Sequence, residues 1–331
     1  MKQLIFIFIV VISVSCKQEQ KENELVKLSG SVFGTSYNIQ YHHKENTNFI
    51  NQIDSLFNTV NQSLSTYIPN SDISKLNRNE INKVDHYFVE VFKSSKTIYK
   101  ETEGVFDPTI GNVVNAWNFG AENNKFLTDS TTIDSLMQFV GFDKLSLSNE
   151  TITKPKSTYI EFNAIAKGYG VDVIGKFLES KNIDNYLVEI GGEIRAKGKN
   201  IEKQSFWKVG IQRPRFDGVS NLNDYVLAIP LKNEAMATSG SYRKFKTDEN
   251  GNRYAHIINT KTGYPSKTNV LSVSVIAKDC MTADAYATAF QAMGIEKVTE
   301  FLKSHPQLKA FIIYENKNKE LKTLNFNNFP E

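Results

Sequence analysis

Two kinds of hydrophobic spacing divide the chain into predicted helices and strands. Residues 47–61 and 85–102 carry apolar side chains three and four positions apart, which predicts two amphipathic helices. Residues 27–43 alternate apolar and polar side chains, which predicts a strand or hairpin around Gly30 and Gly34. The N-terminal part of the chain therefore combines both types of element.

Caps and small residues indicate the other elements. We expect short helices after a cap at Ser71 and from Pro108 after a cap at Asp107, and longer ones near 130–139, from the segment at Glu161 to about Ser180, and from Cys280 to Met293. The expected strands are 185–199 (broken at Gly191 and Gly192), 206–212, 225–231, 234–240, 253–259, 269–277 and 310–314. Because runs of strands outnumber a regular strand–helix alternation, the pattern predicts an α+β fold.

The N-terminus has the pattern of an export signal. Lys2 precedes an apolar run from Leu4 to Val14, which is too short to span a bilayer core of about 30 Å. A small residue followed by Cys16 resembles a bacterial lipoprotein signal, and an ordinary secretory signal with an incidental cysteine is the alternative. We expect a signal peptide at 1–15, a lipidated (palmitate-bearing) flexible tether at 16–27 and one catalytic domain at 28–331.

The charge composition argues against a nucleic-acid partner, and the cysteine content limits disulfide formation. The chain has 39 basic and 36 acidic side chains, a net charge of +3 and no basic stripe, so we expect no nucleic-acid partner. Cys280 is the only cysteine besides Cys16, so lipidation of Cys16 would leave no intramolecular disulfide.

One helix carries a candidate metal site. Asp284 and Thr288 are four residues apart and therefore share a helical face, and the alanines between and around them leave space. A carboxylate and a hydroxyl are oxygen ligands that suit Mg²⁺. The alternative is an alanine-rich packing helix with a solvated aspartate.

The stretch EFNAIAKGYGVD, residues 161–172, is a candidate anion site. Its small residues would let a ligand lie against a helix N-terminus, where free amides favour anions, and Lys167 adds a positive charge. Glu161 could accept hydrogen bonds from a donor-rich ring, and the carbonyl of Ala164 could bind a metal.

Other positions have two interpretations each. His256, in an expected apolar strand, is a candidate general base or a core histidine, and Tyr67 is a stacking ring or a core tyrosine. Asp107 is a ligand contact or a cap. Further candidates are Gly191 and Gly192, which allow close backbone approach or a simple hairpin, and Thr238, Ser239 and Gly240, which are a phosphate contact or a plain turn.

Eight segments in order resemble the ApbE family, the FAD:protein FMN transferases, many of which are bacterial lipoproteins. The segments are GTSYNI, STYIPNSDISKLN, GVFDPTIGNVVNAWNFG, NAIAKGYGVD, VEIGGEIRAKG, ATSGSYR, HIINTKTGYP and MTADAYATA, which together cover nearly all of the mature chain. The resemblance implies a compact α+β core of mixed, largely antiparallel sheets with packed helices around a flavin cleft.

The resemblance also implies the roles of individual residues. FAD would be bound by Phe33, Tyr67, the turn of Val105, Phe106 and Asp107, Glu161, Lys167 and Ile258. Mg²⁺ would be held by Ala164, Asp284, Ala287 and Thr288, and His256 would be the catalytic base. Four positions depart from the family's frequent residues: Glu161, Asn163, Phe33 and Ala287, where Asp, Gly, Met and Ser are common.

The implied reaction is Mg²⁺-dependent transfer of FMN from FAD to a threonine, or serine, of an acceptor protein, with release of AMP. The acceptor would be a flavoprotein such as a subunit of a membrane redox complex, and the enzyme would sit in the cell envelope, lipid-anchored to a membrane and facing the periplasm. The alternatives are a pyrophosphatase that yields FMN and AMP, and a non-catalytic FAD-binding lipoprotein.

Overall fold

A computed structural model describes residues 24–122, 129–215, 224–242, 245–247 and 253–331. The expected signal peptide, Cys16 and most of the expected tether lie outside these residues. Within the described part of the chain, no helix is both long enough and apolar enough to cross a bilayer.

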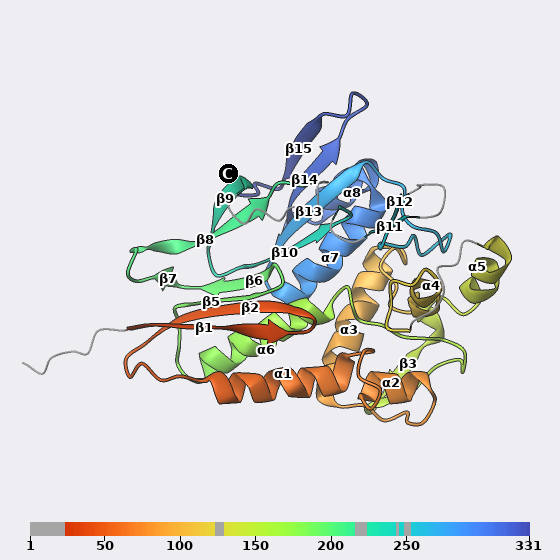
Figure 1. Ribbon diagram of the computed structural model, residues 1–331, viewed down its shortest axis with the longest axis horizontal. Helices are drawn as coiled ribbons and strands as arrows, with labels where there is room; N and C mark the ends of the chain where they lie inside the picture. The colour runs from red at the N-terminus through yellow and green to blue at the C-terminus, as the bar shows by residue number, and fades with distance from the viewer. Residues whose placement is uncertain (1–23, 123–128, 216–223, 243–244, 248–252) are drawn as a thin grey trace, which may run out of the picture.

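The centre of the molecule is an eight-stranded sheet in the order β1-β2-β5-β6-β10-β13-β14-β15 (Figure 1). Each of these strands pairs antiparallel with its neighbours, which confirms the expected α+β fold with largely antiparallel sheets. The strands are β1 Glu24–Val32, β2 Thr35–His43, β5 Tyr186–Ile190, β6 Glu193–Lys197, β10 Ala235–Gly240, β13 Val270–Ala277, β14 Lys309–Glu315 and β15 Leu321–Phe326.

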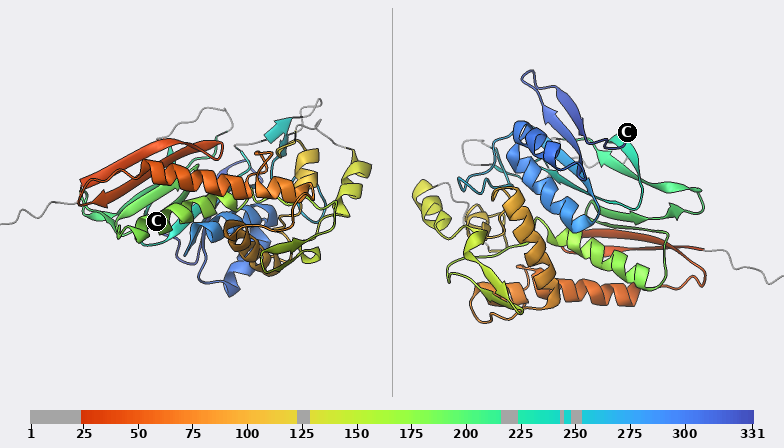
Figure 2. Two further views of the ribbon diagram at one scale, coloured as in Figure 1. Left: turned by 90° about the horizontal axis from the view of Figure 1, so that it is seen from below. Right: turned by 180° about the vertical axis from the view of Figure 1, so that it is seen from behind.

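Helices cover one face of the sheet and a smaller sheet covers the other (Figures 1 and 2). The long helices on the first face are α1 Ile50–Leu64, α3 His86–Glu101, α6 Ala166–Ser180, α7 Cys280–Met293 and α8 Ile295–Ser304. On the second face, β7 Lys199–Asn200, β8 Ser205–Gln212 and β9 Tyr225–Leu231 form a three-stranded sheet. Trp207 of β8 packs with Ile194 and Met236 of the large sheet, so both faces of that sheet contribute to a core.

A peripheral region beside α3 contains the remaining elements. These are α2 Asp72–Asn77, α4 Gly111–Ala116, α5 Ser130–Met137, the 3₁₀ turn Phe142–Lys144, and the two-stranded sheets β3 Ser146–Ser148 with β4 Thr151–Thr153 and β11 Phe245–Thr247 with β12 Arg253–Ala255. Part of this region has its own core, in which Val113 and Trp117 pack with Ile133 and Ile258. Residues of α2, the 3₁₀ turn and β4 instead share the core that contains α3 and α7.

The N-terminal hairpin was predicted correctly, but it starts earlier than expected. Phe33 and Gly34 form its two-residue turn, and both have positive φ, 50° and 73°, as a tight turn between twisted strands requires. Since β1 begins at Glu24, residues 24–27 belong to a paired strand, and their assignment to the flexible tether was wrong.

Several other boundaries differ from the prediction. The helix after Asp107 begins at Gly111 rather than at Pro108, because the Asp107 carboxylate accepts the Thr109 N–H at 2.8 Å and so closes a separate turn. The helix expected from Glu161 begins at Ala166. The terminal strand β15 was missed, because most of its side chains are exposed and its three apolar residues do not alternate regularly with polar ones.

Candidate active site

Helices α6 and α7 meet at their N-termini, and the small residues of α6 make this possible. The Gly168 N–H donates to Oδ2 of Asp284 at 3.0 Å. A Cβ atom at Gly168 would lie 2.3 Å from the Cys280 carbonyl oxygen, so only glycine fits. The lack of bulk in EFNAIAKGYGVD therefore brings Asp284 to the start of α6.

Lys167 and Glu193 complete a buried charged cluster with Asp284. Lys167 Nζ lies 2.6 Å from Glu193 Oε1, and the Glu193 side chain is 2% exposed. The second oxygen, Oε2, is buried and accepts no hydrogen bond. Glu193 was not among the predicted site residues; it directly follows Gly191 and Gly192 and begins β6, a strand that also contains Arg195 and Lys197, so its local sequence does not mark it as buried.

The cluster holds two carboxylates against a single lysine. Burial raises the pKa of Glu193 to about 7, and Lys167 opposes this shift while the charge of Asp284 adds to it. Burial also raises the pKa of Asp284, against the effects of Lys167 and the Gly168 N–H. Burial lowers the pKa of Lys167, but Glu193 and Asp284 outweigh it and raise that pKa overall. A further cation would relieve the unbalanced negative charge.

The expected metal ligands lie on both sides of the contact between α6 and α7. Asp284 is buried, Ala287 is fully buried in α7, and Thr288 is partly buried one turn after Asp284. Ala164 lies in the turn that precedes α6. No group of three or more His, Cys, Asp or Glu side chains suited to a metal occurs in the part of the chain that the structure describes.

This donor set fits Mg²⁺. With few side-chain ligands, a metal here would rely on carbonyl, hydroxyl and phosphate oxygens, which is the usual coordination of Mg²⁺. Two buried carboxylates share one lysine here, and Oε2 of Glu193 has no hydrogen-bond partner, so the cluster has room for a further cation.

An exposed tyrosine flanks the segment before α6. Tyr67 is 56% exposed, so the interpretation as a core tyrosine was wrong. Burial and the charge of the nearby Glu161 raise the pKa of Tyr67. Asn77 fixes this segment, because its amide donates to the Ile160 carbonyl and accepts the Ile160 N–H, both at 2.8 Å.

The turn at 105–107 connects to the same segment. Glu161 N–H donates to the Pro108 carbonyl at 2.9 Å. Phe106 is buried, and the Asp107 carboxylate accepts hydrogen bonds from both the N–H and the hydroxyl of Thr109, which closes a turn before α4; the N-cap of α4 is Ile110, so the expectation of a helix cap at Asp107 was wrong. Burial raises the pKa of Asp107, and the hydrogen bonds from Thr109 oppose that shift.

Ile258 is held against this turn from the other side. The Thr260 hydroxyl donates to the Gly104 carbonyl at 2.6 Å, and Ile258 is buried in the peripheral core beside Trp117. The Trp117 Nε1–H donates to the Gly263 carbonyl at 2.8 Å, which fixes the turn that follows. The segments around residues 105–107 and 258–263 thus form one unit.

His256 does not lie in a strand. It occupies a bend directly after β12, which ends at Ala255, and it is half-buried with its ring edge-on to Phe119 at a centroid distance of 6.4 Å. The expected strand over 253–259 is confirmed only for Arg253–Ala255, which form β12; the chain bends at His256, and Ile257 and Ile258 are both buried after it. A partly exposed histidine is better placed than a core histidine to exchange protons.

The N-terminal hairpin reaches the site through its turn. The Phe33 ring packs edge-on to Phe57 at 5.6 Å and touches Gly170, where a Cβ would lie 2.4 Å from the ring.

Two candidate groups have structural roles instead. The Thr238 hydroxyl is hydrogen-bonded to Ser274 on the neighbouring strand at 2.8 Å. Gly191 and Gly192 form the β5–β6 turn with φ of 63° and 106°, which supports the hairpin interpretation.

We expect Gly168→Ala to destabilise the protein by about 1–3 kcal/mol, although alanine is the better helix former by about 1 kcal/mol. The added methyl group would meet the backbone of Cys280, which cannot move without shifting α7. Gly170→Ala is the matched control in the same helix, because its methyl group would meet the ring of Phe33, which is partly exposed and can rotate. Denaturant unfolding of both variants tests this, and an equal loss would contradict it.

Together these residues bring a lysine, two buried carboxylates and a flanking tyrosine to the N-termini of α6 and α7. Residues 33–312 match the model of the ApbE family. The chain belongs to the ApbE family.

Two curated relatives and two solved structures illustrate the similarity. The FAD:protein FMN transferase of Haemophilus influenzae is 36% identical over 338 residues, covering 96% of this chain and 95% of the relative, and that of Vibrio cholerae is 36% identical over 84% of each. The structure of the flavin transferase ApbE from Vibrio cholerae aligns with a TM-score of 0.82, at 34% identity, over 92% of this chain and 97% of that one. The ApbE protein from Thermotoga maritima aligns at 0.78 and 26% identity, over 90% and 96%.

Proposed function

We propose that the protein transfers the FMN part of FAD to a threonine, or serine, hydroxyl of an acceptor protein in a Mg²⁺-dependent reaction. The curated relatives that span nearly the whole chain bear the name of this reaction. The observation that carries the proposal is the cluster of Asp284, Lys167 and Glu193 at the N-termini of α6 and α7, which has an excess of buried negative charge.

The chain's own residues account for binding of the pyrophosphate. Lys167, in the first turn of α6, would face the negative phosphates of FAD. Tyr67, Glu161, Phe33, Ile258 and the turn of Val105, Phe106 and Asp107 would hold the rest of FAD. Mg²⁺ would be held by Asp284 and Thr288 with the carbonyls of Ala164 and Ala287, and when bound it neutralises charge that develops on the phosphates.

His256 would act as the general base. It accepts the proton of the acceptor hydroxyl as that oxygen bonds to the phosphorus of the FMN moiety. The phosphoanhydride bond to AMP breaks, AMP departs, and FMN remains on the acceptor as a phosphoester. A positioned base of this kind contributes about 10²- to 10⁴-fold to the rate.

Chromatography of the nucleotide products tests the assignment. The mature protein is incubated with FAD, Mg²⁺ and a candidate membrane redox-complex subunit. Transfer yields AMP without an equal amount of free FMN. Equal amounts of free FMN and AMP would identify a pyrophosphatase, and unchanged FAD would identify a carrier; either result would overturn the proposal.

We further propose that the protein is anchored by lipid on Cys16 to a membrane of the cell envelope, facing the periplasm. The support is the short apolar run that ends in Ser15 and Cys16, together with a domain that begins only eight residues later, at Glu24. We expect Cys16→Ser to move the protein from the membrane to the soluble fraction after cell fractionation. An unchanged membrane fraction would contradict lipidation.

A further inference from the structure

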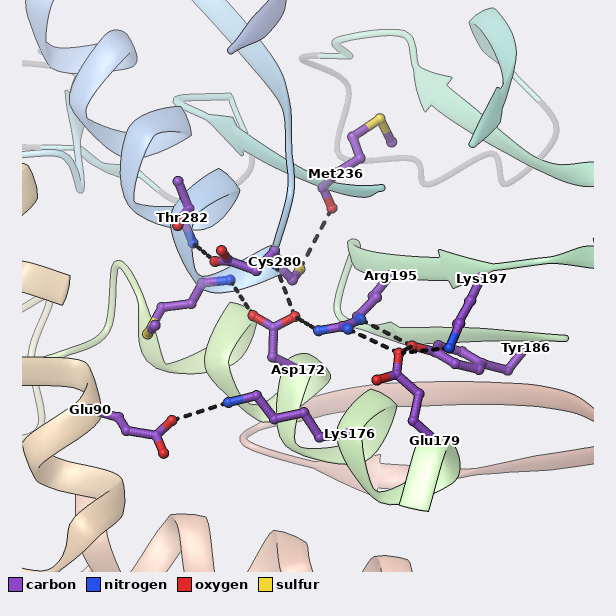
Figure 3. A network of polar contacts seen from close by, with 12 residues as sticks. Glu90, Asp172, Lys176, Glu179, Tyr186, Arg195, Lys197, Met236, Cys280 and Thr282 are labelled. Atoms are coloured by element: carbon purple, nitrogen blue, oxygen red, sulfur yellow. Dashed lines mark hydrogen bonds and ion pairs between the residues drawn. The ribbon is translucent and has the colours of Figure 1, made fainter. Parts of the chain in front are cut away.

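A carboxylate from α6 satisfies the first backbone N–H groups of α7 (Figure 3). Asp172 accepts the Cys280 N–H through Oδ1 at 3.0 Å and the Met281 N–H through Oδ2 at 2.8 Å. The third N–H of that turn, from Thr282, donates to Asp279, the N-cap residue of α7, at 2.9 Å. One of the two carboxylates that cap α7 therefore comes from the neighbouring helix.

Arg195 holds Asp172 from the sheet side. Arg195 Nη1 lies 2.8 Å from Asp172 Oδ1, while its other nitrogens donate to Glu179 at 3.1 Å and to the Tyr186 hydroxyl at 3.0 Å. The Asp172 side chain is only 4% exposed. Arg195 lies two residues after Glu193 in β6. The contact between Arg195 and Asp172 therefore links α6, and through Asp172 also α7, to the strand that carries Glu193.

The contacts between α6 and α7 are reciprocal. Gly168 of α6 donates its N–H to Asp284 of α7, and one helical turn later on α6 the Asp172 carboxylate accepts the N–H groups that start α7. Asp284 in turn lies one helical turn after Cys280. A helical turn rises about 5.4 Å, so the first turn of α7 determines where the Asp284 carboxylate meets Gly168 and Lys167.

We propose that Asp172 is a positioning residue for the divalent cation: by fixing the first turn of α7 against α6, it places the oxygens of Asp284 and Thr288. Asp172 itself lies outside the ligand set and acts through the backbone of α7. This inference rests on the proposed function, because that function supplies the cation.

An asparagine in place of Asp172 would fill the same space but could not make the same contacts. A carboxylate offers two acceptor oxygens, one for each N–H of α7, whereas an amide offers one oxygen and an NH₂ group. The amide would leave a buried N–H unpaired and would also lose the charge that faces Arg195 and the positive end of α7. Asp172→Asn therefore loosens the helix start without removing any proposed metal ligand.

Metal binding is measured directly, with Mn²⁺ as the probe. Electron paramagnetic resonance of free Mn²⁺ during titration into mature protein with FAD gives the dissociation constant without any turnover. We expect Asp172→Asn to weaken Mn²⁺ binding by about 10- to 100-fold, the usual effect of removing a group that orients a metal ligand. Glu179→Gln is the matched control, because it alters another acidic partner of Arg195 that makes no described contact with α7, and its affinity should equal that of wild type.

The melting temperature of each variant is recorded alongside, at conditions where all are folded. A lower melting temperature for Asp172→Asn with wild-type Mn²⁺ affinity would show a merely structural role and overturn the inference. If Asp172→Asn does not fold, Arg195→Met replaces it. Loss of the Nη1 contact to Asp172 should weaken Mn²⁺ binding in the same direction, and unchanged affinity would again overturn the inference. If the wild-type protein with FAD bound no Mn²⁺, the proposed metal site would be wrong, and both this inference and the Mg²⁺-dependent mechanism would fail.

Discussion

Asp284→Asn is expected to reduce FMN transfer by about 10²- to 10³-fold, the range observed when one electrostatic contributor to a transition state is removed. Asparagine keeps an oxygen that can accept the Gly168 N–H, so the helix contact survives while the negative charge next to Lys167 is lost. FAD should bind more weakly but still measurably, because the flavin contacts lie elsewhere. Steady-state rates over a range of Mg²⁺ concentrations provide the measurement.

Asp279→Asn is the control for this variant. It removes one negative charge from the same helix end, and asparagine caps a helix about as well as aspartate. The control should keep nearly the wild-type rate. If Asp284→Asn turned over at the rate of this control, the cation would have to lie elsewhere.

His256→Ala is expected to lower the transfer rate by about 10²- to 10⁴-fold, the contribution of a general base, while FAD affinity stays close to that of wild type. His256 sits in a bend beside Phe119 rather than in the core, so its loss should cost little stability. The wild-type rate should also fall on acidification, because a protonated imidazole cannot accept the hydroxyl proton. This acid limb should be absent from the residual activity of the variant.

His43 provides a matched control for the histidine substitution. It is also half-buried and edge-on to a phenylalanine, Phe49, at a centroid distance of 5.8 Å, but it lies at the end of β2. His43→Ala should leave both the rate and the pH profile unchanged. A drop in melting temperature and FAD affinity for His256→Ala, with an unaltered pH profile, would mean that His256 has a structural role.

Local patterns predicted the helix that carries the side-chain ligands of the proposed metal site. The α7 boundaries, Cys280 to Met293, match the prediction, because an aspartate cap before it and Gly294 after it mark both ends. The shared face of Asp284 and Thr288 follows from helical periodicity alone. The reason for the glycines of α6 was also partly visible, since small residues allow something to approach closely, although the sequence suggested a ligand and the structure shows α7 at Gly168.

Contacts between distant segments could not be predicted in the same way. Glu193, at the start of β6, pairs with Lys167 in the first turn of α6. Nothing in the local sequence around Glu193 distinguishes a buried carboxylate from an exposed one. After the bend at His256, Ile258 forms an isolated bridge with Pro265. The run of apolar residues around Ile258 does not indicate this pairing. Tyr67 was ambiguous for the same reason: its exposure depends on the position of the segment around Glu161.

The mass of the intact acceptor protein tests the central claim most directly. A candidate redox-complex subunit is incubated with FAD and Mg²⁺ and either wild-type protein or Asp284→Asn, and is then weighed by mass spectrometry. The proposed function predicts that wild type raises the acceptor mass by that of FMN less one water, that the gain is lost when the acceptor threonine is replaced by valine, and that Asp284→Asn gives little or none in the same time. An unmodified acceptor together with free FMN and AMP would contradict the transferase assignment.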